Sequence, residues 1–214
     1  MTTAVGRPRG PYASTARRRH EIARAVLGIV AEKGHGHVTT AEVAQRSGSR
    51  EATVMYHFPT KDHLLVAALQ LADEDNDRRL SGDEPAALDL AELRAFAQAV
   101  PGRANVIRLH VTLAGDATIP GHPAHDYFAA RYRTAIDRFA GLVRERQEAG
   151  LADQALDPVE VARQVIAAWD GLQAQWLVTP DFDLGELLVS AVRRLTGQDW
   201  MEARQALPEP GAGA

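Results

Sequence analysis

Apolar residues recur at helical spacing along most of the chain. Ile22, Ala25, Val26, Ile29 and Val30 follow the i, i+3, i+4, i+7, i+8 pattern that places side chains on one face of an α-helix. The same spacing predicts further helices in the second half, around residues 93–100, 106–113, 128–143, 158–178 and 184–197. No segment of the sequence alternates polar and apolar residues as a half-buried strand does. We therefore predict an all-α protein.

Glycines and helix-capping residues divide the first third of the chain into short helices. Gly34 is expected to end the first helix, and Thr39 to cap the second, with Glu42 completing a capping box. The tight turn Ser47-Gly48-Ser49 separates the second helix from a short third one, for which Ser49 is the expected N-cap.

The third predicted helix runs from about residue 50 to residue 57, with Ala52, Val54 and Met55 as its apolar candidates. Phe58-Pro59-Thr60 breaks it, and Thr60 is placed to cap a helix over residues 61–80. A capped helix, a glycine turn and a short polar-faced helix form the layout of a helix-turn-helix, whose second helix enters the major groove of DNA.

Charge is distributed unevenly along the 214 residues. Residues 1–61 hold 10 Lys and Arg against 4 Asp and Glu, a formal charge of +6, whereas the remainder holds 14 against 24, a charge of −10. We call the basic residues 1–61 the head. Because salt screens charges beyond roughly 8–10 Å, a polyanion is expected to bind at the head and not at the acidic remainder of the chain.

Composition narrows the class of protein. The sequence has no cysteine, which excludes a disulfide framework and cysteine-bound zinc. It contains no apolar run long enough for a transmembrane helix and no signal-peptide h-region, so we expect a cytoplasmic protein that does not enter a membrane. Gly, Pro and Arg dominate residues 1–14, expected to form a flexible basic arm, and a flexible tail is expected over residues 207–214.

The run Tyr56-His57-Phe58-Pro59-Thr60-Lys61, followed by Leu64-Leu65, resembles the DNA-binding domain of the TetR (tetracycline repressor-like) family. The segments Ile22-Ala23-Arg24-Ala25, Gly34 and Thr39-Thr40-Ala41-Glu42-Val43-Ala44 extend the resemblance over roughly residues 17–66. The sequence departs from the family pattern at Val30, at Met55 and in the turn Gly48-Ser49-Arg50. The resemblance implies a three-helix DNA-binding domain over residues 15–66.

The resemblance also implies DNA contacts. Thr40, Tyr56, His57 and Lys61 are expected to touch phosphates, while the base-reading candidates are Arg50, Glu51 and Thr53. Three arginines in a row and two residues at helix starts complete the expected set: Arg17, Arg18, Arg19, Thr39 and Ser49. The alternatives are that the arginines, including Arg7 and Arg9 on the arm, are merely solvated, that His57 is a surface histidine and that Tyr56 is structural.

For residues 67–206 the resemblance implies a larger helical domain that binds an inducer and dimerises through the helices at 158–178 and 184–197. Trp176 and Leu188 are candidate interface anchors, although both could equally pack within one subunit. Polar or aromatic side chains on apolar helices are the ligand-binding candidates, each of which could instead be a core residue: His110, Tyr127, Trp169 and Gln173.

Alternative chemistries find less support. His122, His125 and Asp126 surround Pro123 at a predicted helix start, where they serve as caps, so we expect no metal site. The sequence shows no nucleophile elbow, phosphate loop or HExxH helix, and we expect neither an enzyme nor a cofactor. We predict a ligand-released repressor that binds a near-palindromic operator as a homodimer; the alternative is a helix-turn-helix adaptor that binds a protein partner.

Overall fold

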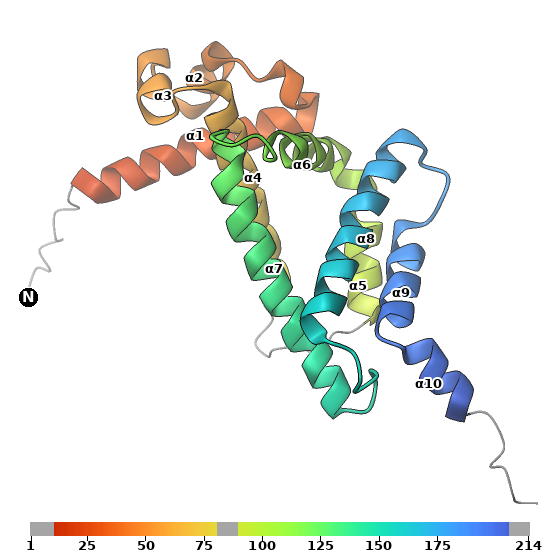
Figure 1. The fold of residues 1–214 in the computed structure, drawn as a ribbon. Coiled ribbons are helices and arrows are strands. Elements are labelled where there is room, and N and C mark those ends of the chain that lie inside the picture. The colour runs from red at the N-terminus through yellow and green to blue at the C-terminus, as the bar shows by residue number, and fades with distance from the viewer. Residues whose placement is uncertain (1–10, 81–89, 206–214) are drawn as a thin grey trace, which may run out of the picture. The chain divides into compact units, whose positions relative to one another are not determined.

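The computed structural model describes residues 11–80 and 90–205, which fall into two compact units, residues 1–80 and 81–214 (Figure 1). Every regular element in the described ranges is a helix, and they contain no strand. The all-α prediction is therefore confirmed. None of the described helices combines the length and the apolarity needed to cross a bilayer.

Over residues 11–80, the first unit contains four α-helices and one 3₁₀ turn. They are α1 (Pro11–Lys33), the turn η1 (His35–His37), α2 (Thr40–Ser47), α3 (Glu51–His57) and α4 (Lys61–Leu80). Its core is formed by the apolar face predicted for the first helix, where Ile22, Val26 and Ile29 are completely buried, together with Val43 and Val54 from α2 and α3. Helix α1 packs on both α2 and α4.

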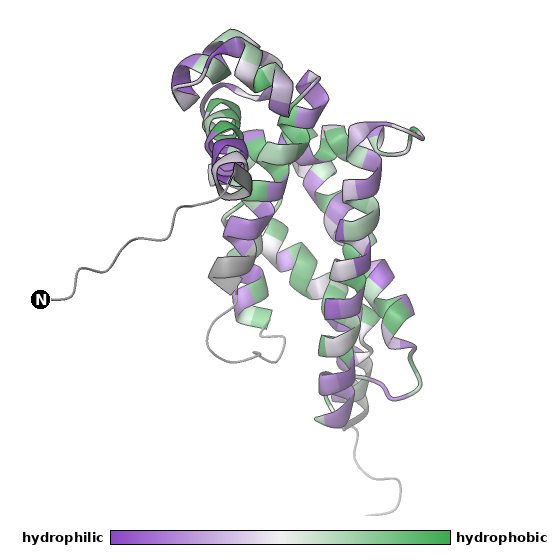
Figure 2. Ribbon diagram, turned by 90° about the vertical axis from the view of Figure 1, so that its left-hand side faces the viewer, coloured by the Kyte–Doolittle hydropathy of each residue, from purple (hydrophilic) through white to green (hydrophobic). Residues whose placement is uncertain are grey.

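The second unit continues with six α-helices in its described part. They are α5 (Leu90–Gln98), α6 (Ala104–Asp116), α7 (Pro123–Glu148), α8 (Pro158–Val178), α9 (Leu184–Leu195) and α10 (Gln198–Gln205), with the 3₁₀ turn η2 (Pro101–Arg103) before α6. Helix α8 packs on α6, α7 and α9, and α5 packs on α9. Hydrophobic and hydrophilic residues are interspersed along these helices (Figure 2), because each buries one face and exposes the other.

Local signals set most helix ends of the first unit. Gly34, at φ 87°, follows the last residue of α1, and the Thr39 hydroxyl accepts a hydrogen bond of 3.3 Å from the Glu42 amide at the start of α2. The second half of the expected capping box is replaced, because the Glu42 carboxylate binds Lys33 at 2.7 Å and Arg46 at 2.9 Å. Thr60 caps α4 as predicted by accepting from the amide of His63 at 3.4 Å.

The expectation that Ser49 caps α3 is wrong, because the N-cap is Arg50, whose side chain makes no capping bond. Gly48, in the left-handed conformation at φ 61°, closes α2, and the Ser49 amide donates back to the Ala44 carbonyl at 2.9 Å. The Ser49 backbone is therefore used to end one helix, and the next begins one residue later.

The chain ends differ in part from the expected arm and tail. Helix α1 begins at Pro11, so the last four residues of the expected arm are helical. Arg7 and Arg9 lie outside the described residues, as does the expected tail at 207–214. The whole of α4 belongs to the first unit, and the functional boundary at residue 66 stays a prediction.

Helix α10 has no counterpart among the predicted elements. Helix α9 ends at Leu195, two residues before the expected end at 197, and Gly197 at φ 71° turns the chain into α10. Arg193 binds the carboxylates of Asp199 at 2.6 Å and Glu202 at 2.5 Å. These ion pairs attach α10 to α9 although α10 has little apolar periodicity of its own.

Candidate nucleic-acid interface and buried polar cluster

Helix α3 has one inward face and one broad outward face. Val54 is completely buried, whereas 82% of the Tyr56 surface and 54% of the Met55 surface are exposed. Because an α-helix has 3.6 residues per turn, Ala52 and Tyr56 lie nearly opposite Val54. The exposed residues Glu51, Ala52, Met55 and Tyr56 leave one side of this short helix available to a groove of DNA.

Of the three apolar candidates on α3, only Val54 faces inward. Ala52 and Met55 are exposed, while Thr53 and His57 are half-buried. Hydrophobicity alone does not decide direction on a helix of seven residues, where Val54 fills the available core position. Met55 thus joins the outward face with Glu51 and Tyr56, and sequence reasoning missed it as a contact candidate.

The residues at the start of α3 differ in accessibility. The Arg50 and Glu51 side chains are exposed, so a ligand can reach them directly. The Ser49 hydroxyl oxygen, by contrast, is buried and has no hydrogen-bond partner among the described residues. Its burial does not favour the DNA contact expected for Ser49, which stays a prediction.

Tyr56 and His57 lie together at the end of α3. Their rings meet edge to face with centroids 5.1 Å apart. Burial lowers the pKa of the His57 imidazole below its usual value of 6.5, and the positive charges of Arg19 and Arg18 lower it further. His57 is therefore neutral at pH 7 and presents a hydrogen-bonding imidazole rather than a fixed positive charge.

The remaining phosphate candidates surround the ends of α2 and α4. Thr39 is exposed and Thr40 half-buried at the start of α2. Lys61, the first residue of α4, is exposed and donates to the Gly36 carbonyl at 3.1 Å. An ammonium group has three donors, so this bond leaves Lys61 able to meet a phosphate while it ties α4 to η1.

The three consecutive arginines of α1 have different partners. Arg17 and Arg18 both bind Glu21, one turn further along the same helix, at 3.6 and 2.8 Å. Arg19 instead donates from Nη1 to the carbonyl of His57 at 2.7 Å, and its guanidinium lies 4.4 Å from the centre of the Phe58 ring. The sequence prediction treated them as one basic cluster, whereas the structure divides them.

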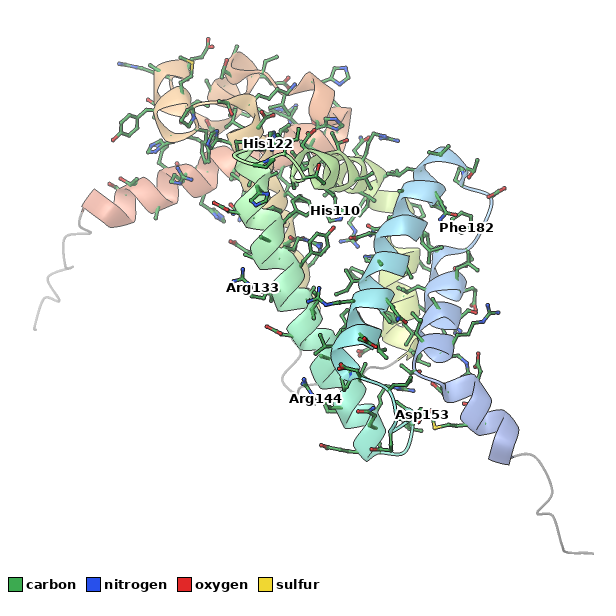
Figure 3. All side chains as sticks on the ribbon, viewed as in Figure 1. His110, His122, Arg133, Arg144, Asp153 and Phe182 are labelled. Carbon is green, nitrogen blue, oxygen red and sulfur yellow. The ribbon has the colours of Figure 1, made fainter. Side chains whose placement is uncertain are left out.

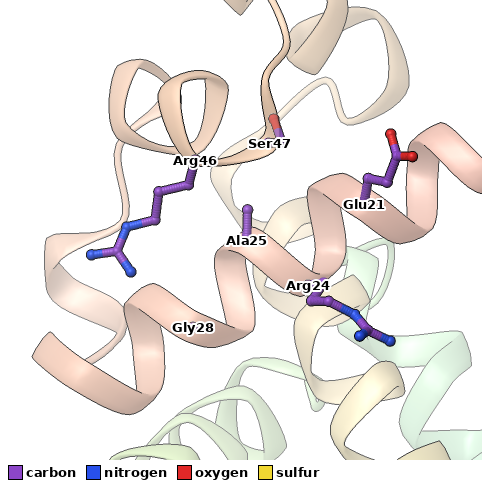
Figure 4. A pocket seen from close by; sticks show the side chains of 6 residues that line it. All are labelled: Glu21, Arg24, Ala25, Gly28, Arg46 and Ser47. Atoms are coloured by element: carbon purple, nitrogen blue, oxygen red, sulfur yellow. The ribbon is translucent and has the colours of Figure 1, made fainter.

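An ion-pair network joins α1 to α2 beside this surface. Arg46 binds Glu32 at 2.7 Å and Glu42 at 2.9 Å, and Lys33 binds Glu42 at 2.7 Å. The bond to Arg46 lowers the pKa of the Glu32 carboxyl, and the bond to Lys33 lowers the pKa of Glu42. A shallow, open groove next to Arg46 (Figure 4) is lined by acidic, basic and small residues. They are Glu21, Arg24, Ala25, Gly28, Arg46 and Ser47.

In the second unit, three polar side chains from three helices meet in a cluster in which His110 is buried and Tyr132 and Asp170 are half-buried. The Tyr132 hydroxyl on α7 donates to Asp170 on α8 at 2.8 Å, and Nε2 of His110 on α6 (Figure 3) lies 3.4 Å from the other Asp170 oxygen. His110 is 4% exposed, and its ring is 5.3 Å from that of Phe128. Burial raises the pKa of Tyr132 to about 12, assisted by the bond to Asp170.

Of the four ligand-binding candidates, His110 belongs to this cluster, and the other three contact residues outside it. Tyr127 contacts the Phe128 ring at 5.1 Å. Trp169 faces Phe96 at 5.7 Å, and buried Gln173 donates to the Trp169 carbonyl at 3.3 Å. Sequence reasoning missed Tyr132 and Asp170 as cluster members; the available signal was a carboxylate, Asp170, directly after Trp169 in the middle of α8.

The side chains of the two histidines near Pro123 contact main-chain atoms. Nδ1 of His122 (Figure 3) accepts from the Ala124 amide at 3.2 Å and caps α7, and Nδ1 of His125 is 2.8 Å from the Ala117 carbonyl oxygen. Across the described ranges, no three His, Asp or Glu side chains gather where they could hold a metal ion.

Helices α8 and α9 share a groove lined with small side chains. Its lining is Ala167, Ala168, Gly171, Leu172, Gln175, Leu187, Ser190, Ala191 and Arg194. Leu187 beside it is 42% exposed and Val178, at the end of α8, is 80% exposed. The two expected anchors differ from these: Leu188 is 2% exposed within the core of the unit, and Trp176 packs against that core.

Comparison with known proteins agrees with this geometry. Residues 22–68 match the family model described as bacterial regulatory proteins, tetR family. No curated protein matches the chain in sequence.

Solved structures resemble nearly the whole chain. A TetR transcription regulator from Haloarcula marismortui has a TM-score of 0.65 at 22% identity, covering 88% of this chain and 98% of its own. The multidrug binding protein EbrR, complexed with imidazole, has a TM-score of 0.63 at 26% identity, covering 90% and 97%. FadR from Bacillus subtilis, in complex with stearoyl-CoA, has a TM-score of 0.64 at 15% identity, covering 83% and 97%.

Proposed function

We propose that the chain is a DNA-binding transcriptional regulator like those of the TetR family, whose family model its residues 22–68 match, and that it represses transcription from a near-palindromic operator and is released by a small-molecule inducer. The observation that carries the proposal is the outward face of α3, where Tyr56 is 82% exposed on a head of formal charge +6. An exposed helix on a basic surface suits insertion into the major groove.

Contacts within this interface divide by their chemistry. Arg50, Glu51, Thr53 and Met55 are the base-reading residues, since side chains on the groove-facing side of a recognition helix reach base edges. Tyr56, His57, Lys61 and Thr40 hold phosphates, and the arginines of α1 add positive charge nearby. Base contacts specify a sequence, while phosphate contacts fix register and supply salt-dependent affinity.

A homodimer supplies the second head. Ala, Gly and Ser make up more than half of the lining of the groove between α8 and α9 and let a second helix pair approach closely, and the lining residue Leu187 is exposed. Two subunits joined there would place two recognition helices on half-sites about one helical turn apart, roughly 34–36 Å or somewhat more.

The inducer is proposed to act through the buried cluster of Asp170, His110 and Tyr132. These residues tie α6, α7 and α8 together by polar contacts at 2.8 and 3.4 Å. A molecule that exchanged these contacts for its own would shift the packing of three helices at once. Imidazole and stearoyl-CoA, bound by EbrR and FadR, differ widely in chemistry, and we propose no particular inducer from them.

The test is selection of the purified protein against a random double-stranded DNA library, followed by sequencing of the retained duplexes. We expect a consensus with two related half-sites. Absence of enrichment even at low salt would contradict operator binding and favour the adaptor alternative. Enrichment of a single unpaired half-site would contradict the dimer while leaving DNA binding intact.

A further inference from the structure

Arg19 connects two elements that lie far apart in the sequence. Its Nη1 donates to the carbonyl oxygen of His57 at 2.7 Å, across 38 residues, and its guanidinium lies over the Phe58 ring at 4.4 Å. We infer that Arg19 is a positioning residue, which fixes the carboxyl end of the recognition helix α3 on α1, and not a phosphate contact. The inference rests on the proposed DNA binding of α3.

The chemistry of this contact suits an anchor. The His57 carbonyl is at the end of α3, where the last carbonyls of a helix lack intrahelical donors and carry partial negative charge. A guanidinium satisfies such a carbonyl with a charge-assisted hydrogen bond, and its flat face stacks on an aromatic ring as an ammonium cannot. One side chain thus holds both the last residue of α3 and the residue that follows it.

The anchor matters because α3 is held by little else of its own. Val54 is the one buried residue of the helix, and Phe58 immediately after it is 3% exposed. Helix α3 packs on α2 alone among the helices with which it shares several contacts, and Val54 is its one completely buried side chain. Fixing its end at His57 and Phe58 sets the direction in which Met55 and Tyr56 meet DNA.

The neighbouring residue Arg17 provides a matched control. It lies on the same helix and carries the same charge, but its partner is Glu21, one turn away at 3.6 Å, and its side chain is 63% exposed. Arg17→Met and Arg19→Met therefore remove the same charge from nearly the same place. Their difference isolates the contact with His57 and Phe58 from general electrostatic attraction.

The experiment measures binding of the full chain to two labelled duplexes, the consensus recovered by selection and a random-sequence pool, over a series of salt concentrations. We expect Arg19→Met to weaken consensus binding roughly tenfold more than Arg17→Met does, the scale of one charge-assisted hydrogen bond. Binding to the random pool and the salt slope on the consensus should be equal in the two variants. Arg19→Lys, which keeps the charge, should still lose consensus affinity.

The opposite pattern would overturn the inference. If Arg19 instead binds a phosphate, Arg19→Met should weaken binding equally on both duplexes, the salt slope should fall by about 0.9, and Arg19→Lys should restore binding. If Arg19→Met lowers the melting temperature too far for binding measurements, the comparison of Arg19→Lys with the wild type decides the question. Failure of the wild type to select any consensus would instead refute the proposed function.

Discussion

At the scale of single residues, the two titratable groups with the clearest functional and structural meaning lie in different units. His57 stands at the end of α3 with its pKa lowered by burial and by Arg19 and Arg18. Tyr132 stands in the buried cluster with its pKa raised to about 12. Each shift predicts a pH dependence of a different quantity, DNA affinity in the first case and folding stability in the second.

Operator affinity is expected to rise as the pH falls. His57 is neutral in the free protein above its lowered pKa, and a phosphate beside the imidazole would favour the protonated form, so binding would take up a proton. Affinity should therefore increase as the pH falls from about 7.5 through about 6.5 and below. The number of protons taken up on binding should approach one for each DNA-bound head. Anisotropy titrations across this range test it, with His57→Gln as the control that should be flat. An equal slope in that variant would show that other histidines are responsible.

Folding stability should depend on Tyr132 at alkaline pH. A phenol whose folded pKa is raised from 10 to about 12 contributes stability that is fully present below pH 10 and is lost as the pH rises toward 12. Denaturant unfolding of the wild type and Tyr132→Phe at about pH 7 and about pH 11 measures this. The variant should be less stable at neutral pH by about 1–3 kcal/mol, the cost of removing one partner of a hydrogen bond to a charged group. A difference that does not shrink at the higher pH would contradict the assignment.

Several residue contacts had no signature in the sequence. The family motif predicts that Tyr56, His57 and Lys61 contact phosphates, and this stays a prediction. The contact between Arg19 and the His57 carbonyl could not be predicted, because a main-chain acceptor 38 residues away leaves no trace in residue type. Asp170 and Tyr132 were equally hidden, since their meeting depends on how α7 packs against α8.

At the scale of elements, the apolar period and the capping residues account for most of the helices. Gly34, Thr39 and Thr60 each act where local chemistry predicts, since a cap needs only its own backbone neighbours. Ser49 failed as a cap because the turn that ends α2 uses its amide. Helix α10 was missed because its eight residues show little apolar periodicity; Arg193 of α9 forms ion pairs with its Asp199 and Glu202.

Close approach of α5 and α9 makes Gly185 sensitive to substitution. A Cβ at this position would lie 2.8 Å from the Arg94 carbonyl oxygen and 2.9 Å from the side chains of Arg94 and Gln98. Gly185→Ala should destabilise the second unit by about 1–3 kcal/mol, the usual cost of overpacking. The control is Gly141→Ala in the interior of α7, where a Cβ meets open space and helix propensity favours alanine by about 1 kcal/mol. Thermal unfolding measures both, and equal effects would mean that the two helices separate at little cost.

At the scale of the whole molecule, the protein is expected to function as two copies. A large charged residue in the small-residue groove between α8 and α9 should prevent a second copy from docking there. Ala191→Glu is therefore expected to produce a monomer in sedimentation equilibrium and to weaken binding to a two-half-site duplex more than to a single half-site. Ala129→Glu, at an exposed position of α7, is the matched control. A dimer that survives Ala191→Glu would place the interface elsewhere.

The outward face of α3 has a consequence for how such a protein can diverge. Met55 and Tyr56 are largely exposed, while Val54 and Phe58 carry the packing. Exposed positions away from the core usually tolerate replacement within about 0.5 kcal/mol. A duplicated copy of the gene could therefore change the DNA sequence that it recognises through single substitutions at positions 51 and 55, without first acquiring compensating changes in the fold.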